Sequence, residues 1–174
     1  MKYVAFGKTG IRVSELCLGT MTFGNEADED ASRGIMDRAF ERGVNFFDTA
    51  DVYSRGTTEE IVGRWLNGRR KDVVLASKVH YPTGKGVNER GSSRLHILHG
   101  VENSLKRLQT DYLDLLYLHH WDDETPIEES LSAMDHLVQQ GKVLYCGVSN
   151  FSAWQTMKTV DCAKANRFAL RPKN

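Results

Sequence analysis

Four stretches of apolar sequence each end in a polar side chain that can do chemistry: VNFFD at residues 44–48, VVLASK at 73–78, LDLLYLH at 113–119 and LYCGVSN at 144–150. The first polar residues at these ends are 30, 41 and 30 positions apart. A strand with its crossover helix and loops needs roughly thirty residues or more. The stretches are therefore predicted to be successive strands of a parallel sheet. Because an α/β barrel builds its active site at the carboxyl ends of its strands, the pattern also indicates an enzyme.

The segments between these stretches have the apolar periodicity and the end residues of helices. Helices are predicted over residues 30–42, 57–66, 92–108 and 126–137, with a fifth after Ser152. Asp30 and Ser152 are the predicted caps of the first and fifth helices, and Ser92 or Ser93 is expected to start the third. In the first of them, Ile35, Ala39 and Phe40 form the expected buried face.

The N-terminal residues alternate around a turn at residues 8–10, which predicts a short β-hairpin. A first buried strand is expected directly afterwards, at residues 16–20.

The predicted strands are continuous apolar runs, which is typical of parallel strands covered by helices. We therefore expect one α/β domain over residues 1–174, of the (β/α)8 TIM-barrel type but incomplete. Five strand–helix units fit, or six if residues 167–170 begin another strand, whereas a closed barrel takes about 250 residues. An open doubly wound sheet could use the same strands, but no GxGxxG follows the first of them.

Composition excludes several classes of partner. Lys plus Arg and Asp plus Glu both number 23, so the net charge is zero and nothing favours a nucleic-acid partner. No apolar run approaches the roughly 18 residues of a membrane helix. The three cysteines have no metal-ligand spacing, which favours a reducing, cytoplasmic compartment.

Two histidine patterns raise the question of a metal, and we expect none. His96 and His99 lie three residues apart on a predicted helix, where a solvated helix face is the favoured interpretation. His119, His120, Asp48 and His80 could bind a divalent metal, as in barrel hydrolases. However, the first strand has no His-x-His pair of the kind typical of those enzymes. A metal-dependent hydrolase therefore remains only an alternative.

Asp48, Tyr53, Lys78 and His119 form a more convincing set for proton transfer. Tyrosine has a pKa of about 10 and is a poor acid at neutral pH, but a nearby ammonium favours its ionised form. A carboxylate paired with the lysine keeps it charged, and a histidine can position a carbonyl oxygen for protonation. The alternative is a buried Asp–Lys ion pair that only stabilises the fold.

These residues lie in motifs that resemble the aldo-keto reductases, NADPH-dependent carbonyl reductases built on a (β/α)8 barrel. The motifs are FGKTGIRVSELCLGTMTFG (6–24), GVNFFDTADVYSRGTTEEIVG (43–63), VVLASKV (73–79), SLKRLQTDYLDLLYLHHWDDETPIEESL (104–131) and GKVLYCGVSNFS (141–152). The resemblance covers residues 3 to 155. It implies reduction of a small aldehyde or ketone, with NADPH as the cofactor.

The resemblance also implies a role for each residue of the proton-transfer set. Tyr53 would be the general acid, and Lys78 and Asp48 would tune it. His119, rather than His120, would orient the substrate, because the family's histidine directly follows the apolar strand.

The remaining site residues are implied in the same way. Ser149 and Asn150 would hydrogen-bond the nicotinamide carboxamide, and Thr20, Met21 and Asp48 would lie near the cofactor. Phe23, Trp121 and the loop of residues 79–91 would line the substrate pocket.

The likeness is expected to fade beyond Thr156, so that three of the family's strands and much of its cofactor site have no counterpart here. Such a chain is expected to bind NADPH weakly, to have little activity, and to self-associate through exposed sheet edges. The family also resembles potassium-channel β-subunits, so a non-catalytic, cofactor-binding interaction protein is the second interpretation of the sequence.

Overall fold

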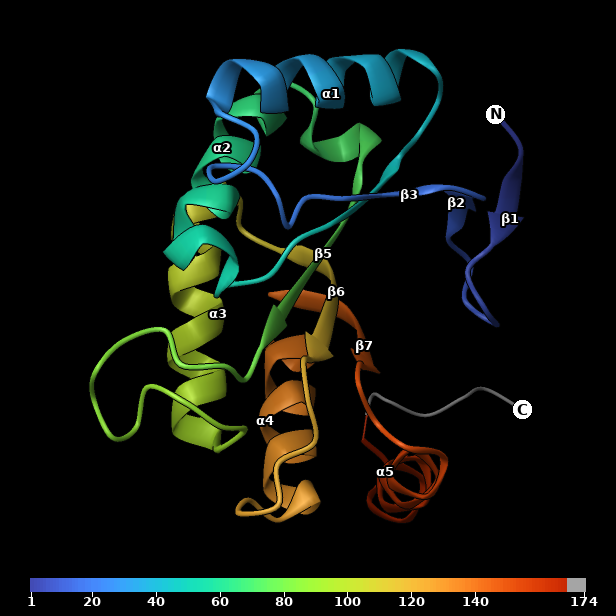
Figure 1. Cartoon of the computed structure of the whole chain (residues 1–174). Coiled ribbons are helices and arrows are strands. Elements are labelled where there is room, and N and C mark those ends of the chain that lie inside the picture. Colours follow the sequence, from blue (N-terminus) through green and yellow to red (C-terminus); the bar gives the residue numbers. More distant parts are fainter. Residues whose placement is uncertain (169–174) are drawn as a thin grey trace.

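The protein is described by a computed structural model, which places residues 1–168. An N-terminal hairpin is followed by parallel strands that alternate with helices (Figure 1). The hairpin strands are β1 (Tyr3–Ala5) and β2 (Arg12–Ser14). The sheet strands are β3 (Cys17–Gly19), β4 (Phe46–Asp48), β5 (Val74–Val79), β6 (Leu113–Leu118) and β7 (Val143–Val148). The helices are α1 (Glu29–Glu41), α2 (Thr57–Leu66), α3 (Arg94–Leu108), α4 (Ile127–Gln139) and α5 (Ala153–Asn166), with short 3-10 turns at Tyr53–Gly56 and Arg70–Asp72.

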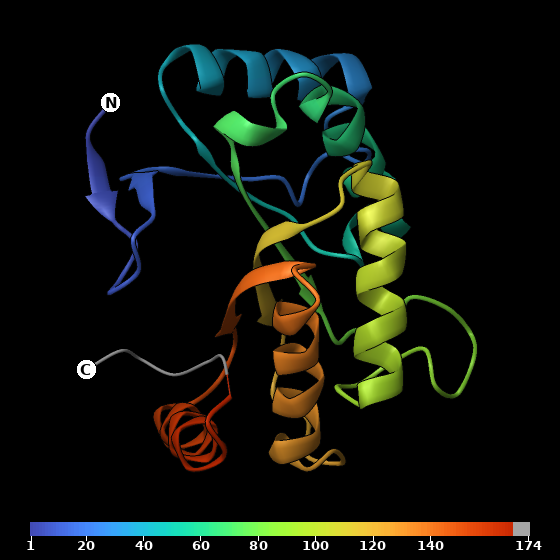
Figure 2. The same ribbon diagram turned by 180° about the vertical axis from the view of Figure 1, so that it is seen from behind.

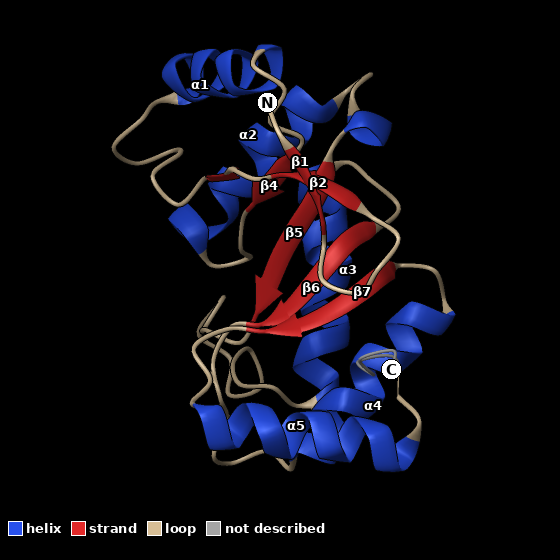
Figure 3. Cartoon of the chain, turned by 90° about the vertical axis from the view of Figure 1, so that its right-hand side faces the viewer, coloured by secondary structure: helices blue, strands red, loops and turns tan. Residues whose placement is uncertain are grey.

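The five sheet strands pair in the order in which they occur in the chain, and every pair is parallel. Their carboxyl ends therefore meet at the same end of the sheet, as Figure 3 shows for the arrowheads of β5, β6 and β7. This arrangement confirms the predicted α/β fold, an incomplete barrel sheet with its helices. The predicted start of a sixth strand is not observed at Arg167, which ends α5 in a left-handed conformation. The rest of that prediction, from residue 169, lies outside the described residues.

A hydrophobic core fills the space between the central strands and the helices. Phe47 of β4 and Leu75 of β5 are completely buried there, and the Phe47 ring stacks on Trp65 of α2 with 5.0 Å between ring centroids. Figure 2 shows α3 and α4 standing side by side along the strands that they cover. Successive side chains of a strand point to opposite faces of the sheet. Phe47 and Leu75 face the core, so the residues next to them along β4 and β5 point to the opposite face, where the site is built.

The hairpin is fixed at the amino end of the sheet. The Phe6 ring packs edge-on against Phe46, the first residue of β4, at 5.6 Å. The Tyr3 hydroxyl donates to the Gly43 carbonyl at 2.9 Å, and the Ser14 amide donates to Asn45 Oδ1 at 2.7 Å. The opposite end of the sheet, where the strands finish, is left clear by the hairpin.

Three of the five helices begin at a side-chain cap, while α2 and α4 begin after Gly56 and Pro126 without one. Ser93 caps α3, and Ser152 forms a capping box with Gln155 at the start of α5. The cap of α1 lies two residues earlier than predicted, because the side chain of Asp28 rather than of Asp30 accepts a hydrogen bond from the Ala31 amide, and the helix begins at Glu29.

At the side of the sheet where β3 lies, two predictions of burial were wrong. The strand was expected to be buried, but Cys17 and Gly19 are exposed because no described strand pairs with their outer side. In α1 the buried residue is Met36, whereas Ile35 is exposed. Ile35 and Leu16 instead line an open apolar groove of about 550 Å³ between α1 and the edge of the sheet.

None of the helices between residues 1 and 168 is both long and apolar enough to cross a membrane.

Candidate active site

Asp48 and Lys78 are brought together by the register of two neighbouring strands. Asp48 at the end of β4 lies opposite Ala76 of β5, and Lys78 follows two residues later on the same face of the sheet. Lys78 Nζ donates to Asp48 Oδ2 at 2.5 Å and to the Thr49 carbonyl at 2.8 Å. The ammonium is thus buried but fully paired, as a buried charge must be to remain ionised.

Tyr53 reaches the same ammonium from the loop that follows β4. Its hydroxyl accepts a hydrogen bond from Lys78 Nζ at 3.1 Å, and Nζ lies 4.9 Å from the centre of the ring. The two residues after Tyr53, Ser54 and Arg55, have left-handed backbone conformations with φ of 46° and 55°. Ser54 is held there because its hydroxyl donates to the Phe23 carbonyl at 2.8 Å. Backbone strain of this kind is concentrated at functional sites.

His119 lies at the end of β6, with its ring 5.9 Å from that of Tyr53 and at 75° to it. Burial lowers the pKa of this histidine to about 4, and the charge of Lys78 acts in the same direction. The imidazole is therefore neutral at neutral pH. Its Nδ1 has no hydrogen-bond partner among residues 1–168. A neutral imidazole can donate one hydrogen bond to a carbonyl oxygen.

Ser149 and Asn150 follow β7, next to His119. The Ser149 amide donates to the Leu118 carbonyl at 2.9 Å, which continues the pairing of β6 and β7. Asn150 is left-handed with φ of 55°, and its Nδ2 donates to the His119 carbonyl at 2.8 Å and to Ser149 Oγ at 3.2 Å. The amide nitrogen is thus occupied, while Asn150 Oδ1 remains an acceptor and the Ser149 hydroxyl remains a donor.

Of the two residues predicted after the first strand, Thr20 supports the site from within and Met21 lies at the surface. The Thr20 hydroxyl is buried and donates to the Asp48 carbonyl at 2.9 Å, so it fixes the end of β4. Met21 is 64% exposed and lines an open hollow together with Tyr53 and Arg55.

The two predicted pocket residues differ in position. Phe23 is buried in the hydrophobic core, and its carbonyl serves the site by accepting a hydrogen bond from the Ser54 hydroxyl. Trp121 is half-buried and packs edge-on against Phe151 at 5.3 Å and Trp154 at 5.4 Å. Trp121 thus lies in an aromatic group beyond the ends of β6 and β7.

Tyr81 is a neighbour of the site that the sequence did not single out. It lies three residues after Lys78 in the loop that leaves β5, and its ring packs edge-on against His119 at 4.8 Å. The sequence does show that Tyr81 lies close to the end of a predicted strand. Its residue type gives no further sign of a role, because it is one of many polar residues in a long loop.

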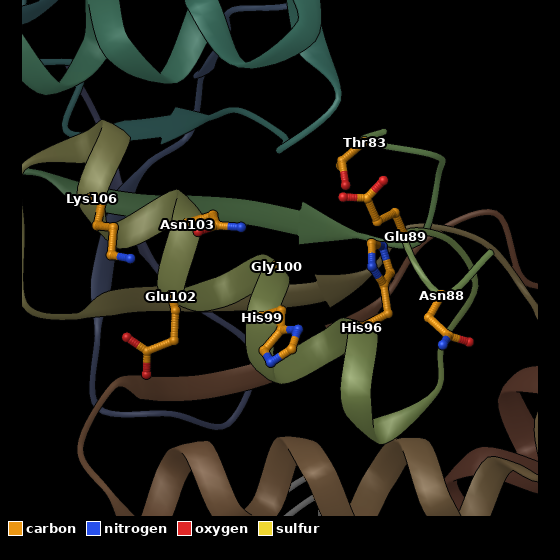
Figure 4. A pocket seen from close by; sticks show the side chains of 9 residues that line it. All are labelled: Thr83, Asn88, Glu89, His96, His99, Gly100, Glu102, Asn103 and Lys106. Atoms are coloured by element: carbon orange, nitrogen blue, oxygen red, sulfur yellow. The ribbon is translucent and has the colours of Figure 1, made fainter. Parts of the chain in front are cut away.

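A separate hollow of about 420 Å³ lies between this loop and α3 (Figure 4). It is lined by Thr83, Asn88, Glu89, His96, His99, Gly100, Glu102, Asn103 and Lys106. The prediction of a solvated face was wrong for His96, which is buried, while His99 is exposed. Between residues 1 and 168, no group of three or more His, Cys, Asp or Glu side chains is arranged to hold a metal ion.

Comparison with known protein families gives a clear result. Residues 15–170 match the model of the aldo/keto reductase family. The chain belongs to that family. The match reaches residue 170, so the likeness extends further than Thr156, where it was expected to fade. The family's (β/α)8 barrel accounts for the parallel five-stranded sheet, of which the described residues form an incomplete part.

Three relatives illustrate the range of this aldo/keto reductase family. An uncharacterized oxidoreductase, YrpG of Bacillus subtilis, is 45% identical over 179 residues, which cover 97% of this chain and 55% of the relative. A probable voltage-gated potassium channel subunit beta of Arabidopsis thaliana is 45% identical over 159 residues, or 89% and 48% of the two chains. Norsolorinic acid reductase A of Aspergillus parasiticus is 42% identical over 172 residues, or 90% and 44%. The chain thus spans about half the length of the curated relatives it matches.

Proposed function

We propose that this chain carries the proton-donating part of a carbonyl reductase site, which converts an aldehyde or ketone to an alcohol with NADPH as reductant. The observation that carries the proposal is the position of Lys78 Nζ, 2.5 Å from Asp48 Oδ2 and 3.1 Å from the Tyr53 hydroxyl. One ammonium is shared by a carboxylate that keeps it charged and a phenol that it can activate.

Each residue has a distinct task in this proposal. Tyr53 donates its proton to the carbonyl oxygen as that oxygen gains negative charge, and the Lys78 ammonium stabilises the phenolate that remains. Asp48 holds the ammonium in place. His119, neutral because burial lowers its pKa to about 4, donates a hydrogen bond that orients the carbonyl without competing as an acid.

The chemistry of Ser149 and Asn150 fits the nicotinamide end of the cofactor. A carboxamide has one carbonyl acceptor and an NH₂ donor, which complement the Ser149 hydroxyl and Asn150 Oδ1 respectively. NADPH would supply the hydride that reduces the carbonyl carbon. Thr20 would act on the cofactor side only through the backbone of Asp48, since its hydroxyl is already bonded there, while exposed Met21 is free to contact the cofactor directly.

The test is Tyr53→Phe, with Tyr145→Phe on strand β7 as the matched control. Proton donation typically contributes about 10²–10⁴-fold to the rate, so Tyr53→Phe should lower aldehyde reduction by that order, while NADPH binding, followed by cofactor fluorescence, stays close to that of the parent. Tyr145→Phe should leave both unchanged. A Tyr53→Phe rate within a few-fold of the parent would remove Tyr53 from the acid role.

The names of the relatives support a second candidate, a cofactor-binding subunit of a potassium channel. Relatives from Arabidopsis thaliana and rice carry the name of probable voltage-gated potassium channel subunit beta. Both candidates predict cofactor binding, and turnover separates them: NADPH binding without reduction of any of a panel of aldehydes and ketones would favour the channel subunit. For either function we propose a reducing, cytoplasmic setting, which the three free cysteines support.

A further inference from the structure

Asp51 is a buried carboxyl group that the proposed reaction does not use. It lies between Asp48 and Tyr53 in the chain and is only 2% exposed. Neither of its carboxyl oxygens has a hydrogen-bond partner among the described residues. Its backbone amide donates to the Lys78 carbonyl at 3.2 Å, so the residue is tied to the strand that carries the catalytic lysine. A buried carboxylate without partners is costly, and such a group normally stays neutral.

The groups around Asp51 favour the neutral form. Helix α2 contributes Glu59, a fully buried carboxylate that accepts hydrogen bonds from Ser77 and Arg107. Strand β5 contributes Lys78, whose ammonium is already engaged by Asp48. Burial first, and the charge of Glu59 second, raise the pKa of Asp51 to about 8, against smaller opposing effects of Arg107, the nearby Val52 backbone amide and Lys78.

Helix α3 closes the space above the carboxyl group. A Cβ added at Gly100 would come 3.7 Å from Asp51 Oδ2 and 2.8 Å from Val79 Cγ2. Because Asp51 is only 2% exposed, bulk water does not reach its carboxyl group where it lies. It can be hydrated only if the segment between Asp48 and Tyr53 moves.

We propose that Asp51 is a positioning residue: as a neutral carboxylic acid it allows the segment from Asp48 to Tyr53 to pack closely against α2 and α3, and its ionisation displaces Tyr53 and sets the alkaline limit of carbonyl reduction. The proposal rests on the proposed function, because it assigns the pH limit of that reaction to a residue that does not touch the substrate.

The pH dependence has a definite sign. The pKa of Asp51 is raised in the folded chain to about 8 from the usual 3.8. Between these values the folded chain holds a proton that the unfolded chain has lost, so the free energy of unfolding falls as pH rises from about 4 to about 8 and then levels off. Above about pH 8 the folded chain itself ionises, and Tyr53 is displaced.

The experiment compares the parent with Asp51→Asn and Asp51→Ser, both neutral, and with Asp72→Asn as an exposed control. Unfolding in urea is measured from pH 5 to pH 9, and the rate of aldehyde reduction is measured at pH 7 and pH 9. If only the neutral form is active, a group with a pKa of about 8 lowers the parent rate roughly tenfold between these two values.

The expected result has two parts. Asp51→Asn and Asp51→Ser lose less stability between pH 5 and pH 9 than the parent does, and their rates at pH 9 fall several-fold less. Asp72→Asn behaves as the parent in both measurements. If the stability of Asp51→Asn depended on pH in the same way as that of the parent, the claim that Asp51 is a neutral carboxyl group would be wrong. If the unfolding free energy of Asp51→Asn changed less with pH than that of the parent, but its rate of aldehyde reduction still fell as much between pH 7 and pH 9, the positioning role would be wrong. A parent without turnover would overturn the proposed function and the role that rests on it, while the urea data would still decide the protonation of Asp51.

Discussion

The central strands and the edge strands of this sheet are held in different ways. Strands β5 and β6 have a neighbouring strand on each side, α3 packs on β5, and nearly all residues of the two strands are buried. Strands β3 and β7 have one described neighbour each, and most of their residues are exposed or half-buried. The number of neighbouring strands accounts for part of this difference, since β4 has a strand on each side but is fully buried only at Phe47.

The comparison shows which part of the chemistry depends on local packing. Lys78 and His119 stand at the ends of the two central strands, and Asp48 and Tyr53 come from β4 and the loop behind it. Contacts within the described chain fix all four. The proposed nicotinamide contacts, Ser149 and Asn150, stand at the end of an edge strand, where hydrogen bonds to the end of β6 hold them.

The largest expected effect on stability comes from replacing a leucine of a central strand by alanine, compared with the same replacement in an edge strand. Leu75 of β5 is 0% exposed and Leu144 of β7 is 44% exposed. Leu75→Ala should lower the free energy of unfolding by about 2–5 kcal/mol, and Leu144→Ala by about 0.5 kcal/mol or less, both measured by urea denaturation. Equal losses would mean that β7 is as well covered as the central strands.

A smaller effect is expected from His119 in acid. Its pKa is lowered from 6.5 to about 4 in the folded chain. As pH falls, His119 therefore gains its proton in the unfolded chain before it does so in the folded chain. The free energy of unfolding consequently decreases as pH falls from about 6.5 to about 4. His119→Gln should lose less stability over this range than the parent, whereas His99→Gln, at an exposed position, should follow the parent. A parallel profile for His119→Gln would show that the histidine is not buried in its neutral form.

The smallest change in stability is expected at the apolar groove beside β3, where the effect is on association. Leu16 is 61% exposed and lines this groove with Ile35. We expect the 174-residue chain to self-associate through such edges, because unpaired strands and apolar faces favour pairing with another copy. Leu16→Lys should lower the mass in solution toward 19.7 kDa while changing the unfolding free energy by no more than about 0.5 kcal/mol. A monomeric parent would remove this expectation.

The sequence predicted the order of strands and helices because long apolar runs and capping residues are local signals. It also placed Asp48, Lys78 and His119 together, since the ends of parallel strands meet at one edge. Burial was less predictable. Ile35 and Met36 are adjacent and both apolar, and the packing of α1 against α2 decides which is buried.

Two residues show why the remaining parts of the site were not predictable. Phe23 was expected in the substrate pocket, but the chain after β3 turns it into the core, which residue type alone does not reveal. Asp51 reads as one more polar residue of a loop, and its burial depends on the close approach of α3 at Gly100. Long-range packing determines both positions.

The central claim is that Tyr53 and Lys78 act as one proton-donating unit. A double-mutant cycle with Tyr53→Phe, Lys78→Met and both together tests it most directly, with the rate of aldehyde reduction as the readout. Residues that act as a unit are strongly non-additive, so each single change should cost about 10²–10⁴-fold, and the double variant little more than the worse of the two. Losses that multiply in the double variant would contradict the shared ammonium seen between Asp48 and Tyr53.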